Sequence, residues 1–470
     1  MADICLIYAR PSKRVVQALH DILSQRYSVW WDQDIHAGDY RNEIEKQLKQ
    51  AKCVIPIWCQ ASRTSQNVVD EAVYAERHHV PLLPIRIERV DFPIGLGGLH
   101  AVDMIDWKGD ASDQRIQDLF RNIESTILAR PEALNLADRR LPIPMFFRSV
   151  SSHETALRPA AAVQALKLVP PDALLISAYD IINEPKKERD RMIGDLDSCR
   201  SAGSLVLLDS GNYEASRKQD KTWKRQELHK ALQIVPHDLT LCFDDLNPPS
   251  DIEGIVRRVV KSARRDAKQT LTPVLPIVHA PRNSQGDIIF EVIPQAIKQI
   301  CQELRPIAVA IPERELGGGI LARARTIYTI RQTLNELGFY QPLHLLGTGN
   351  PLSIAILSAV GADWFDGLEW CRTVADNESG RLYHLHQYDF FAWQSQLAAT
   401  SPIVKEAVAS DKIAFTGKVI FHNLEFFTAW MKELREDLRN DKIDRFLTAK
   451  LPLGKESMQL LEQAVPEVFG

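Results

Sequence analysis

Residues 205–211 read LVLLDSG, a short apolar run that ends on an aspartate and is followed by a serine and a glycine. Such a run, bounded by turn residues, is typical of a buried strand in a parallel sheet. The aspartate then stands at the carboxyl end of the strand, which is where ligands bind in parallel α/β folds. The same arrangement recurs along the chain, and this recurrence indicates the fold class.

Eight apolar runs of this kind follow one another in the larger part of the chain. They lie at 143–147, 174–178, 205–208, 239–243, 274–278, 307–310, 343–346 and 364–365. Most neighbouring runs are separated by roughly 25–35 residues, which is room for one helix and two loops. Eight strand–helix units close a (β/α)8 barrel, so we expect a TIM-like barrel, with a doubly wound open sheet as the structural alternative.

The barrel interpretation predicts where functional residues stand, because the loops after the strands carry the active site in this fold. Those positions hold Asp209, Asp244, His279, Glu313, Gly347 and Asp366. An aspartate in such a loop often only caps a helix, so each one alone is weak evidence. Three aspartates at three strand ends favour a catalytic or binding site.

A shorter α/β pattern precedes the barrel. Its predicted strands are 4–8, 28–31, 53–58, 82–87 and 102–105, and a helix that begins after Ser112 follows them. Pro131 ends that helix, and the proline-rich stretch after it indicates a linker. We therefore expect an N-terminal domain at 1–130, a linker at 131–144, the barrel at 145–440 and a C-terminal tail at 441–470.

The composition is that of an ordinary globular protein, with 45% hydrophobic and 25% charged residues and a net charge of −4. No apolar run approaches the roughly 18 residues of a membrane span, and Asp3 stands where a signal peptide needs positive charge. The seven cysteines form no CxxC pair and no zinc-site spacing. We therefore expect a cytoplasmic protein with reduced thiols and no metal site.

Three motifs within the first 110 residues, in the right order, resemble those of TIR domains. Residues 3–10 (DICLIYAR) resemble the first strand, residues 29–38 (VWWDQDIHAG) the second strand and its loop, and residues 65–72 (SQNVVDEA) the helix with the catalytic glutamate. The resemblance implies a flavodoxin-like parallel sheet. Because many bacterial TIR domains cleave NAD at the nicotinamide–ribose bond, it also implies that NAD is the substrate, that Glu71 is catalytic and that the domain self-associates.

Further residues of this domain are assigned to NAD binding. Arg10 follows the first strand and would meet the pyrophosphate, since arginine binds phosphates in bidentate fashion. Trp31 or Trp30 would stack on a ring of the ligand, and Asp34 lies in the loop of the second motif. Asn67 stands where related sequences often carry a tryptophan. The alternative is that the domain serves self-association alone.

Motifs that span most of 141–440 resemble tRNA-guanine transglycosylases and their DNA-modifying relatives. They are 208–214 (LDSGNYE), 243–245 (FDD), 316–319 (LGGG), 345–351 (LLGTGNP), 362–366 (ADWFD) and 421–427 (FHNLEFF). The resemblance implies that Asp366 is the nucleophile toward the sugar and that Asp209 is the acid/base. It also implies that Asp244 reads a guanine-like edge, with Gly318 and Gly319 near the base.

The sequence departs from that family around the base. Asn212 replaces the second glycine of the acid/base loop, Tyr213-Glu214 replaces Phe-Gln, and His279 replaces a glutamine at the fifth strand end. His279 is still assigned to the binding pocket. The zinc-binding cysteines of the family are absent before His422, and a lone histidine is more often a hydrogen-bonded core residue than a metal ligand. No zinc is therefore expected.

A basic stripe lies in one predicted helix. Arg257, Arg258, Lys261, Arg264, Arg265 and Lys268 recur at helical spacing and share one face. Such a face either binds nucleic-acid phosphates or is simply solvated.

Three whole-protein hypotheses remain open. In the first, the TIR domain destroys NAD as the effector of a bacterial antiviral response, while the barrel senses a nucleotide, a modified base or nucleic acid. In the second, the barrel exchanges bases in tRNA or DNA, and the TIR domain is an oligomerisation module. In the third, both folds are inactive and the chain is an interaction protein.

Overall fold

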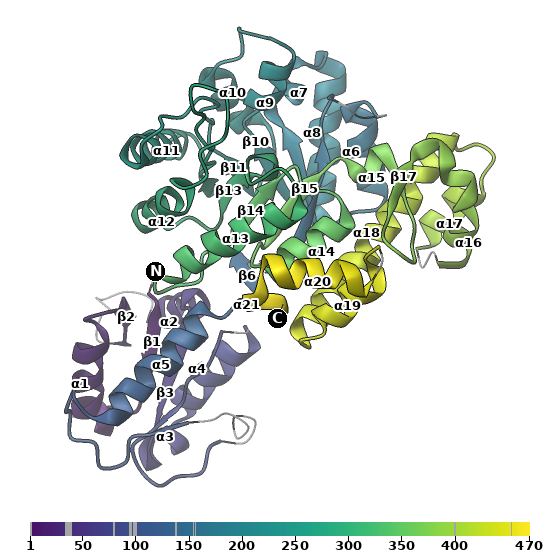
Figure 1. Cartoon of the computed structure of the whole chain (residues 1–470). Coiled ribbons are helices and arrows are strands. Elements are labelled where there is room, and N and C mark those ends of the chain that lie inside the picture. The colour runs from purple at the N-terminus through teal and green to yellow at the C-terminus, as the bar shows by residue number, and fades with distance from the viewer. Residues whose placement is uncertain are drawn as a thin grey trace. The chain divides into compact units, whose positions relative to one another are not determined.

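The computed structural model describes residues 2–470 except 33–39, 79, 94–95, 97–100, 137–138, 154, 156, 399–400 and 453. The chain divides into two compact units, and Figure 1 labels their elements. Unit 1 is Met1–Pro131 with Asn135–Arg140 and Asn335–Tyr340. Unit 2 is Glu132–Leu134, Leu141–Leu334 and Gln341–Gly470.

Unit 1 is built on a five-stranded parallel sheet in the order β2-β1-β3-β4-β5. The strands are β1 (Ile4–Ile7), β2 (Val29–Trp30), β3 (Cys53–Trp58), β4 (Ile85–Arg86) and β5 (Val102–Asp103). The helices are α1 (Lys13–Leu23), α2 (Tyr40–Gln50), α3 (Gln60–Thr64), α4 (Gln66–Arg77) and α5 (Gln114–Leu128). The predicted flavodoxin-like sheet is thus confirmed.

Both faces of this sheet are covered, and β1 shows why the strand is apolar throughout. Ile4 and Leu6 belong to one core, which is filled from α1 and α5. Cys5 and Ile7 belong to the other, which is filled from α2 and α4. Successive side chains of a strand point to opposite faces, so a strand covered on both sides must be apolar at every position.

Unit 2 is an eight-stranded parallel barrel. Its sheet runs in the order β12-β11-β10-β9-β8-β15-β14-β13. The strands are β8 (Met145–Val150), β9 (Ala173–Ser177), β10 (Leu205–Asp209), β11 (Leu239–Leu241), β12 (Val274–Leu275), β13 (Val309–Pro312), β14 (Leu343–Leu346) and β15 (Trp364–Gly367). A parallel bridge between Ile277 and Ala310 joins the two ends of the sheet, so the barrel nearly closes. The predicted barrel is confirmed and the open-sheet alternative is wrong.

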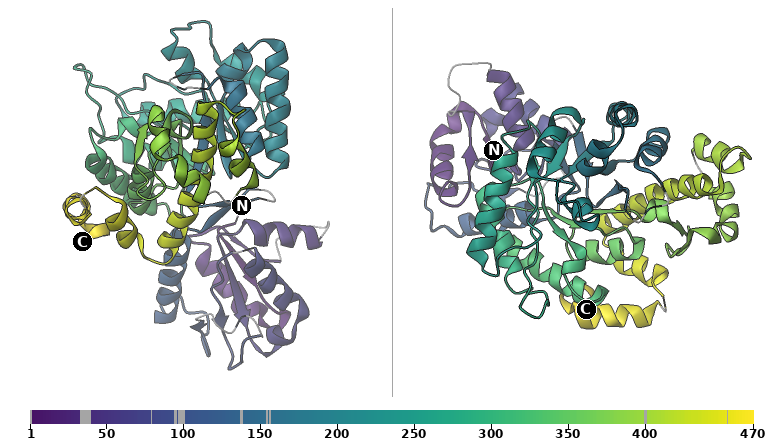
Figure 2. Two further views of the ribbon diagram at one scale, coloured as in Figure 1. Left: turned by 90° about the vertical axis from the view of Figure 1, so that its right-hand side faces the viewer. Right: turned by 90° about the horizontal axis from the view of Figure 1, so that it is seen from above.

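Helices surround these strands, as the two views of Figure 2 show. The longer ones are α6 (Pro159–Leu168), α8 (Lys186–Ser201), α10 (Arg225–Ile234), α11 (Ile252–Asp266), α12 (Ile293–Leu304), α13 (Ile320–Asn335), α14 (Pro351–Ala359) and α18 (Phe415–Arg439). Short helices fill the loops after the strands: α7 (Ala178–Asn183), α9 (Asn212–Arg217), η3 (Glu313–Glu315) and α15 (Glu369–Arg372).

The stretch expected to be a linker contains two paired strands, β6 (Ala133–Leu136) and β7 (Arg139–Pro142). The stretch expected to be a tail forms three helices, α19 (Ile443–Lys450), α20 (Lys455–Ala464) and α21 (Pro466–Phe469). Arg325 of α13 pairs with Glu467 of α21 at 2.7 Å, which ties the end of the chain to the barrel.

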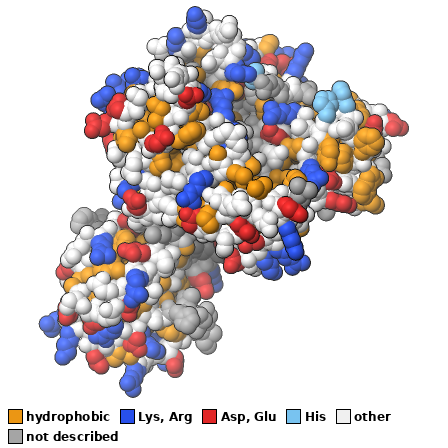
Figure 3. Space-filling view, in the orientation of Figure 1, with side chains coloured by type: hydrophobic (Ala, Val, Ile, Leu, Met, Phe, Trp, Pro, Cys, Tyr) orange, Lys and Arg blue, Asp and Glu red, His pale blue; other side chains and the backbone are white. Residues whose placement is uncertain are grey.

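A lobe follows β15 and leads into α18. It consists of the hairpin β16 (Thr373–Ala375) and β17 (Leu382–His384), then η4 (Leu385–Phe390), α16 (Ala392–Ala398) and α17 (Pro402–Ala409). Phe390, Trp393 and Leu397 are exposed on this lobe, which shows hydrophobic side chains in Figure 3. Within the described part of the chain, none of the helices has the length and apolar character that a membrane span requires.

Candidate functional sites

Helix α4 places Glu71 at the edge of the core of unit 1. Val68, Ala72 and Ala75 of this helix are buried against the sheet, and Glu71 is half-buried beside that stripe. Burial, together with the negative charges of Asp32 and then Asp70, raises the pKa of the Glu71 carboxyl to about 7. A carboxyl group with such a pKa changes charge near neutrality, which is a frequent property of catalytic acids and bases.

Asp32 is held in place at the end of β2. The Tyr8 hydroxyl donates a hydrogen bond of 2.6 Å to Asp32 Oδ1. Trp31 is 5% exposed and stacks on Tyr8 and on His20, with ring centroids 6.0 and 5.0 Å apart. Trp31 therefore packs against Tyr8 and His20 within the protein, and its stacking on a ligand stays a prediction. Trp30 is also buried.

Arg10 is exposed in η1 (Arg10–Ser12), directly after β1. Among the described residues, no hydrogen bond or ion pair engages its guanidinium group, so the structure does not join it to Glu71. Asp34 lies outside the described residues. Of the residues assigned to NAD in this unit, the structure brings Glu71 and Trp31 into one neighbourhood, through Asp32. Sequence reasoning did not single out Tyr8 or Asp32.

In unit 2 the strand-end residues converge as predicted, because parallel strands bring their carboxyl ends to one rim of the barrel. The Ser210 hydroxyl, after β10, donates to Asp244 Oδ1 at 2.7 Å. Asp244, after β11, in turn contacts His279, which follows β12. On the other side of the barrel, Gly347 N after β14 donates to Asp366 Oδ1 of β15 at 3.2 Å.

Asp366 is a buried carboxylate surrounded by donors. The Ser149 hydroxyl donates to its Oδ2 at 2.9 Å, and His344 Nε2 lies 3.1 Å from its Oδ1. His344 Nδ1 is buried without a hydrogen-bond partner, so a proton is best placed on Nε2, from which it is donated to Asp366. These donors fix the orientation of the Asp366 carboxyl group at the mouth of the barrel.

Asp209 has the opposite environment. Burial, then the negative charges of Glu214 and Asp244, raise the pKa of the Asp209 carboxyl well above its ordinary value. The backbone nitrogen of Gly211 donates a hydrogen bond of 2.9 Å to its Oδ2. Burial and the charge of Asp180 also raise the pKa of Glu214, to about 7. The fold thus gives the two carboxyl groups different environments: the pKa of Asp209 is raised, whereas hydroxyl, imidazole and backbone donors surround Asp366.

The predicted base-reading residue Asp244 is already bonded within the protein. His279 Nε2 lies 3.1 Å from Asp244 Oδ2, and His279 Nδ1 lies 3.0 Å from Glu315 Oε1. Burial opposes a charge on His279, but the hydrogen bonds and charges of the two carboxylates outweigh it and raise the pKa of the imidazole to about 10. Burial alone would raise the pKa of the Asp244 carboxyl. The hydrogen bond from His279 outweighs this effect and holds that pKa below its ordinary value.

The glycine loop after β13 is fixed by Arg323. This arginine contacts Glu313 at 2.7 Å and donates to the Gly317 carbonyl at 3.0 Å. A Cβ atom at Gly317, where φ is +147°, would lie 2.9 Å from Ala322, so this position requires glycine. Nothing lies within 4 Å of a Cβ at Gly318 or Gly319. The space beside these two glycines is open, which leaves their assignment to base binding a prediction.

His422 is a core residue of the lobe. Its Nδ1 lies 2.7 Å from the Ser395 hydroxyl and its Nε2 lies 2.7 Å from the Ala375 carbonyl. In the described ranges, no three His, Cys, Asp or Glu side chains are grouped as metal ligands. Asn423 adds three further hydrogen bonds to backbone groups of the same region. Polar side chains therefore fasten this lobe to α18.

Comparison with known proteins confirms both resemblances. Residues 4–120 match the model of the TIR domain family, so the chain carries a TIR domain at its N-terminus. The rest is distantly similar to archaeal tRNA-guanine(15) transglycosylases. The protein from Methanopyrus kandleri is 20% identical over 257 residues, which is 53% of each chain. The protein from Korarchaeum cryptofilum is 22% identical over 344 residues, 68% of this chain and 54% of the relative. The chain spans about half the length of these curated relatives.

Proposed function

We propose that the TIR domain hydrolyses NAD at the bond between nicotinamide and ribose, with Glu71 as the catalytic carboxylate. The observation that carries this proposal is the position of Glu71, half-buried on α4 beside Asp32 in a TIR domain. TIR domains often hydrolyse NAD. The three neighbouring carboxyl groups Asp32, Asp70 and Glu71 give this edge a negative potential, which suits the positively charged nicotinamide ring.

The chemistry uses a carboxylate because positive charge develops on the ribose. When the N-glycosidic bond breaks, its electron pair leaves with nicotinamide and the ribose ring becomes oxocarbenium-like. The Glu71 carboxylate stabilises that charge and accepts hydrogen bonds from ribose hydroxyls. Water then adds at the anomeric carbon and loses a proton. Arg10, exposed after β1, would bind the pyrophosphate.

In this proposal the whole chain acts as an effector in a bacterial antiviral response. The TIR domain cleaves NAD after self-association, and the barrel senses a nucleotide, a modified base or nucleic acid. A sensor of this kind works if its ligand binds one arrangement of the chain better than another. The TIR domain and the retained acidic residues of the barrel mouth support this division of labour.

The test is release of nicotinamide from NAD by the full-length protein. Glu71→Gln should abolish the release, because the amide cannot offset the ribose charge. Glu76→Gln is the matched control, since Glu76 is an exposed glutamate on the same helix. The proposal is wrong if NAD stays intact at high protein concentration with nucleic acid added, or if Glu71→Gln remains active.

A second candidate function is base exchange in the barrel on tRNA or DNA. The contrast between Asp366, surrounded by donors, and Asp209, with its raised pKa, favours it. Asp366 would attack the anomeric carbon while the base leaves with the bonding electrons, and Asp209 would protonate that base. The hydrogen bonds of Asp244 to Ser210 and His279 argue against this second function, because the residue that would read the base is already engaged. Entry of labelled guanine into tRNA or DNA, lost in Asp366→Asn, would establish this activity.

A further inference from the structure

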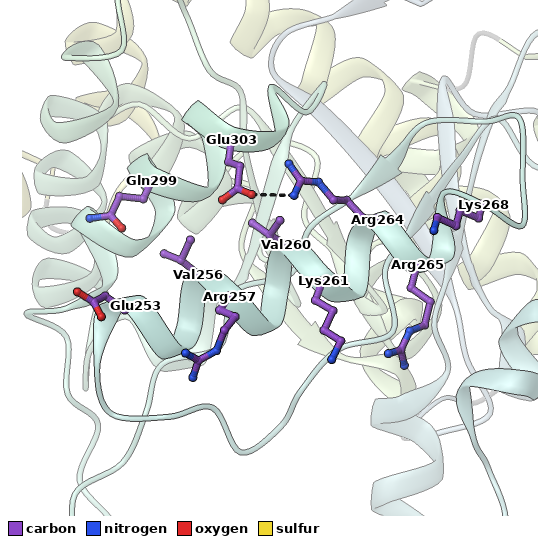
Figure 4. A pocket seen from close by; sticks show the side chains of 10 residues that line it. All are labelled: Glu253, Val256, Arg257, Val260, Lys261, Arg264, Arg265, Lys268, Gln299 and Glu303. Carbon is purple, nitrogen blue, oxygen red and sulfur yellow. Dashed lines mark ion pairs between the residues drawn. The ribbon is translucent and has the colours of Figure 1, made fainter.

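A groove with a cavity of about 650 Å³ lies between α11 and α12, on the outside of the barrel. Figure 4 shows the side chains that line it. Five of them are cations: Arg257, Lys261, Arg264, Arg265 and Lys268. These are five of the six residues of the predicted basic stripe. The sixth, Arg258, is paired with Asp245 at 2.8 Å instead.

The amphipathic pattern of α11 builds this groove. Val256 and Val260 are buried and lie between the two helices in Figure 4. Beside these valines the cations recur at every third or fourth residue, so they form a row along the exposed part of α11 and the residues just after it. Arg257, Lys261 and Arg265, spaced four residues apart, extend toward the same side in Figure 4.

Most of these cations have no intramolecular partner. Arg264 contacts Glu303 of α12 at 2.8 Å. Within the part of the chain that the structure describes, the side chains of Arg257, Lys261, Arg265 and Lys268 form no hydrogen bond or ion pair. Four unpaired cations in one row repel each other, which costs stability unless an anion is bound.

The charge of the groove contrasts with that of the chain. Its five cations stand against two carboxylates, Glu253 and Glu303, in a protein whose net charge is −4. From Arg257 to Arg265 the row is about 12 Å long at 1.5 Å per helical residue, and Lys268 follows just beyond the end of α11. An exposed row of this length fits several successive phosphates better than the compact group of a single nucleotide.

We propose that the α11–α12 groove binds the phosphate backbone of a double-helical nucleic acid. None of the residues that the structure shows lining the groove is aromatic, so it offers no platform for stacking exposed bases. Contact is therefore with phosphates, independent of base sequence. This site is separate from the mouth of the barrel and goes beyond NAD cleavage. It supplies a surface through which nucleic acid reaches the chain.

The experiment measures binding of a fluorescein-labelled 20-base-pair RNA duplex to the full-length protein by anisotropy, at several NaCl concentrations. The test variant is Lys261→Glu/Arg265→Glu. The matched control is Lys186→Glu/Lys187→Glu, which makes the same change in net charge at two exposed lysines of α8. A DNA duplex of the same length, a single-stranded RNA of 20 nucleotides and a polyglutamate peptide are compared. Thermal unfolding and circular dichroism confirm that each variant folds.

We expect the test variant to bind the duplex at least about tenfold more weakly than wild type. The slope of log affinity against log salt should fall by about 2, one for each lost phosphate contact, and the control should match wild type. Three results would overturn the proposal. The first is that the control variant weakens duplex binding as much as the test variant does. The second is that wild type does not bind the duplex at 50 mM salt. The third is that wild type binds the single strand or polyglutamate more tightly than either duplex.

Discussion

His279 joins Asp244 to Glu315 through both of its ring nitrogens, at 3.1 and 3.0 Å, and all three side chains are buried. An imidazolium between two carboxylates is a satisfied unit, whereas either carboxylate alone would be a buried, unpaired charge. The side chains predicted to read a base are therefore held in an ion network of the protein itself. A base that bonds to Asp244 would compete with the Ser210 hydroxyl and His279 for its oxygens.

Replacement of His279 by glutamine should destabilise the barrel by about 3–5 kcal/mol at pH 6, because it leaves Asp244 and Glu315 without a cation. The stability that His279 supplies is complete below pH 6.5, its unfolded pKa, and is lost as the pH rises through about 10. Urea unfolding of both proteins at pH 6, 8 and 10 tests this. The difference in unfolding free energy between wild type and His279→Gln should shrink steadily as the pH rises. A difference that stays constant would contradict the proposed ion network.

Glu71→Gln should stabilise unit 1 above neutral pH. The folded protein holds the Glu71 proton up to about pH 7, while the unfolded chain releases it near 4.5, so the unfolding free energy falls across that window. Removing the carboxyl group should raise the unfolding free energy by about 1–3 kcal/mol at pH 8 and leave it unchanged at pH 4. Thermal melts at both pH values measure the gain. In wild type, NAD cleavage should rise through pH 7 as Glu71 ionises.

The two catalytic candidates of the barrel should respond oppositely to isosteric replacement. Asp209→Asn removes a carboxyl group whose ionised form the buried site disfavours, so we expect the variant to gain stability relative to wild type as the pH rises. Asp366→Asn replaces one carboxylate oxygen by an NH₂ group, which faces either the Ser149 hydroxyl or the donors of His344 and Gly347, and should cost about 2–3 kcal/mol. Denaturant titrations of both variants at pH 6 and 8 compare them; equal losses would refute the assignment.

Gly211→Ala should destabilise the barrel strongly. Gly211 has φ +74°, and a Cβ atom there would lie 2.5 Å from the backbone nitrogen of Tyr179. The loop that bonds Asp209 would have to move, at a cost of about 2–4 kcal/mol. Gly203→Ala is the control, because it also has positive φ, +103°, with nothing within 4 Å of its Cβ. A loss no larger than that of the control would show that the close approach is unimportant.

The sequence predicted the strands well because each is a continuous apolar run, and it predicted which residues stand at the strand ends. It did not predict which side chains form hydrogen bonds or ion pairs with each other. Glu315 lies inside a short helix, and nothing in its local pattern indicates the bond to His279. His344 offered a usable signal, a polar residue inside the apolar run 343–346, and it proves to contact Asp366.

The basic stripe on the surface shows the same limit, because the sequence pattern does not predict which of its cations have partners. Helical spacing identified the cations of α11, but Arg258 and Arg264 are neutralised by carboxylates distant in sequence, Asp245 and Glu303. Charge periodicity fixes which face a cation occupies. Whether that cation has a partner depends on neighbouring loops and helices, which the spacing within one helix does not describe.

The protons held at the barrel mouth have a thermodynamic consequence. The pKa of Glu214 is raised to about 7 and that of Asp209 is also raised, so a cationic guest that favours their ionised forms would drive protons into solution. Association with such a guest would be coupled to proton release, so its apparent affinity would climb with alkalinity. The heat recorded by titration calorimetry would differ between phosphate and Tris, in proportion to the ionisation enthalpy of each buffer.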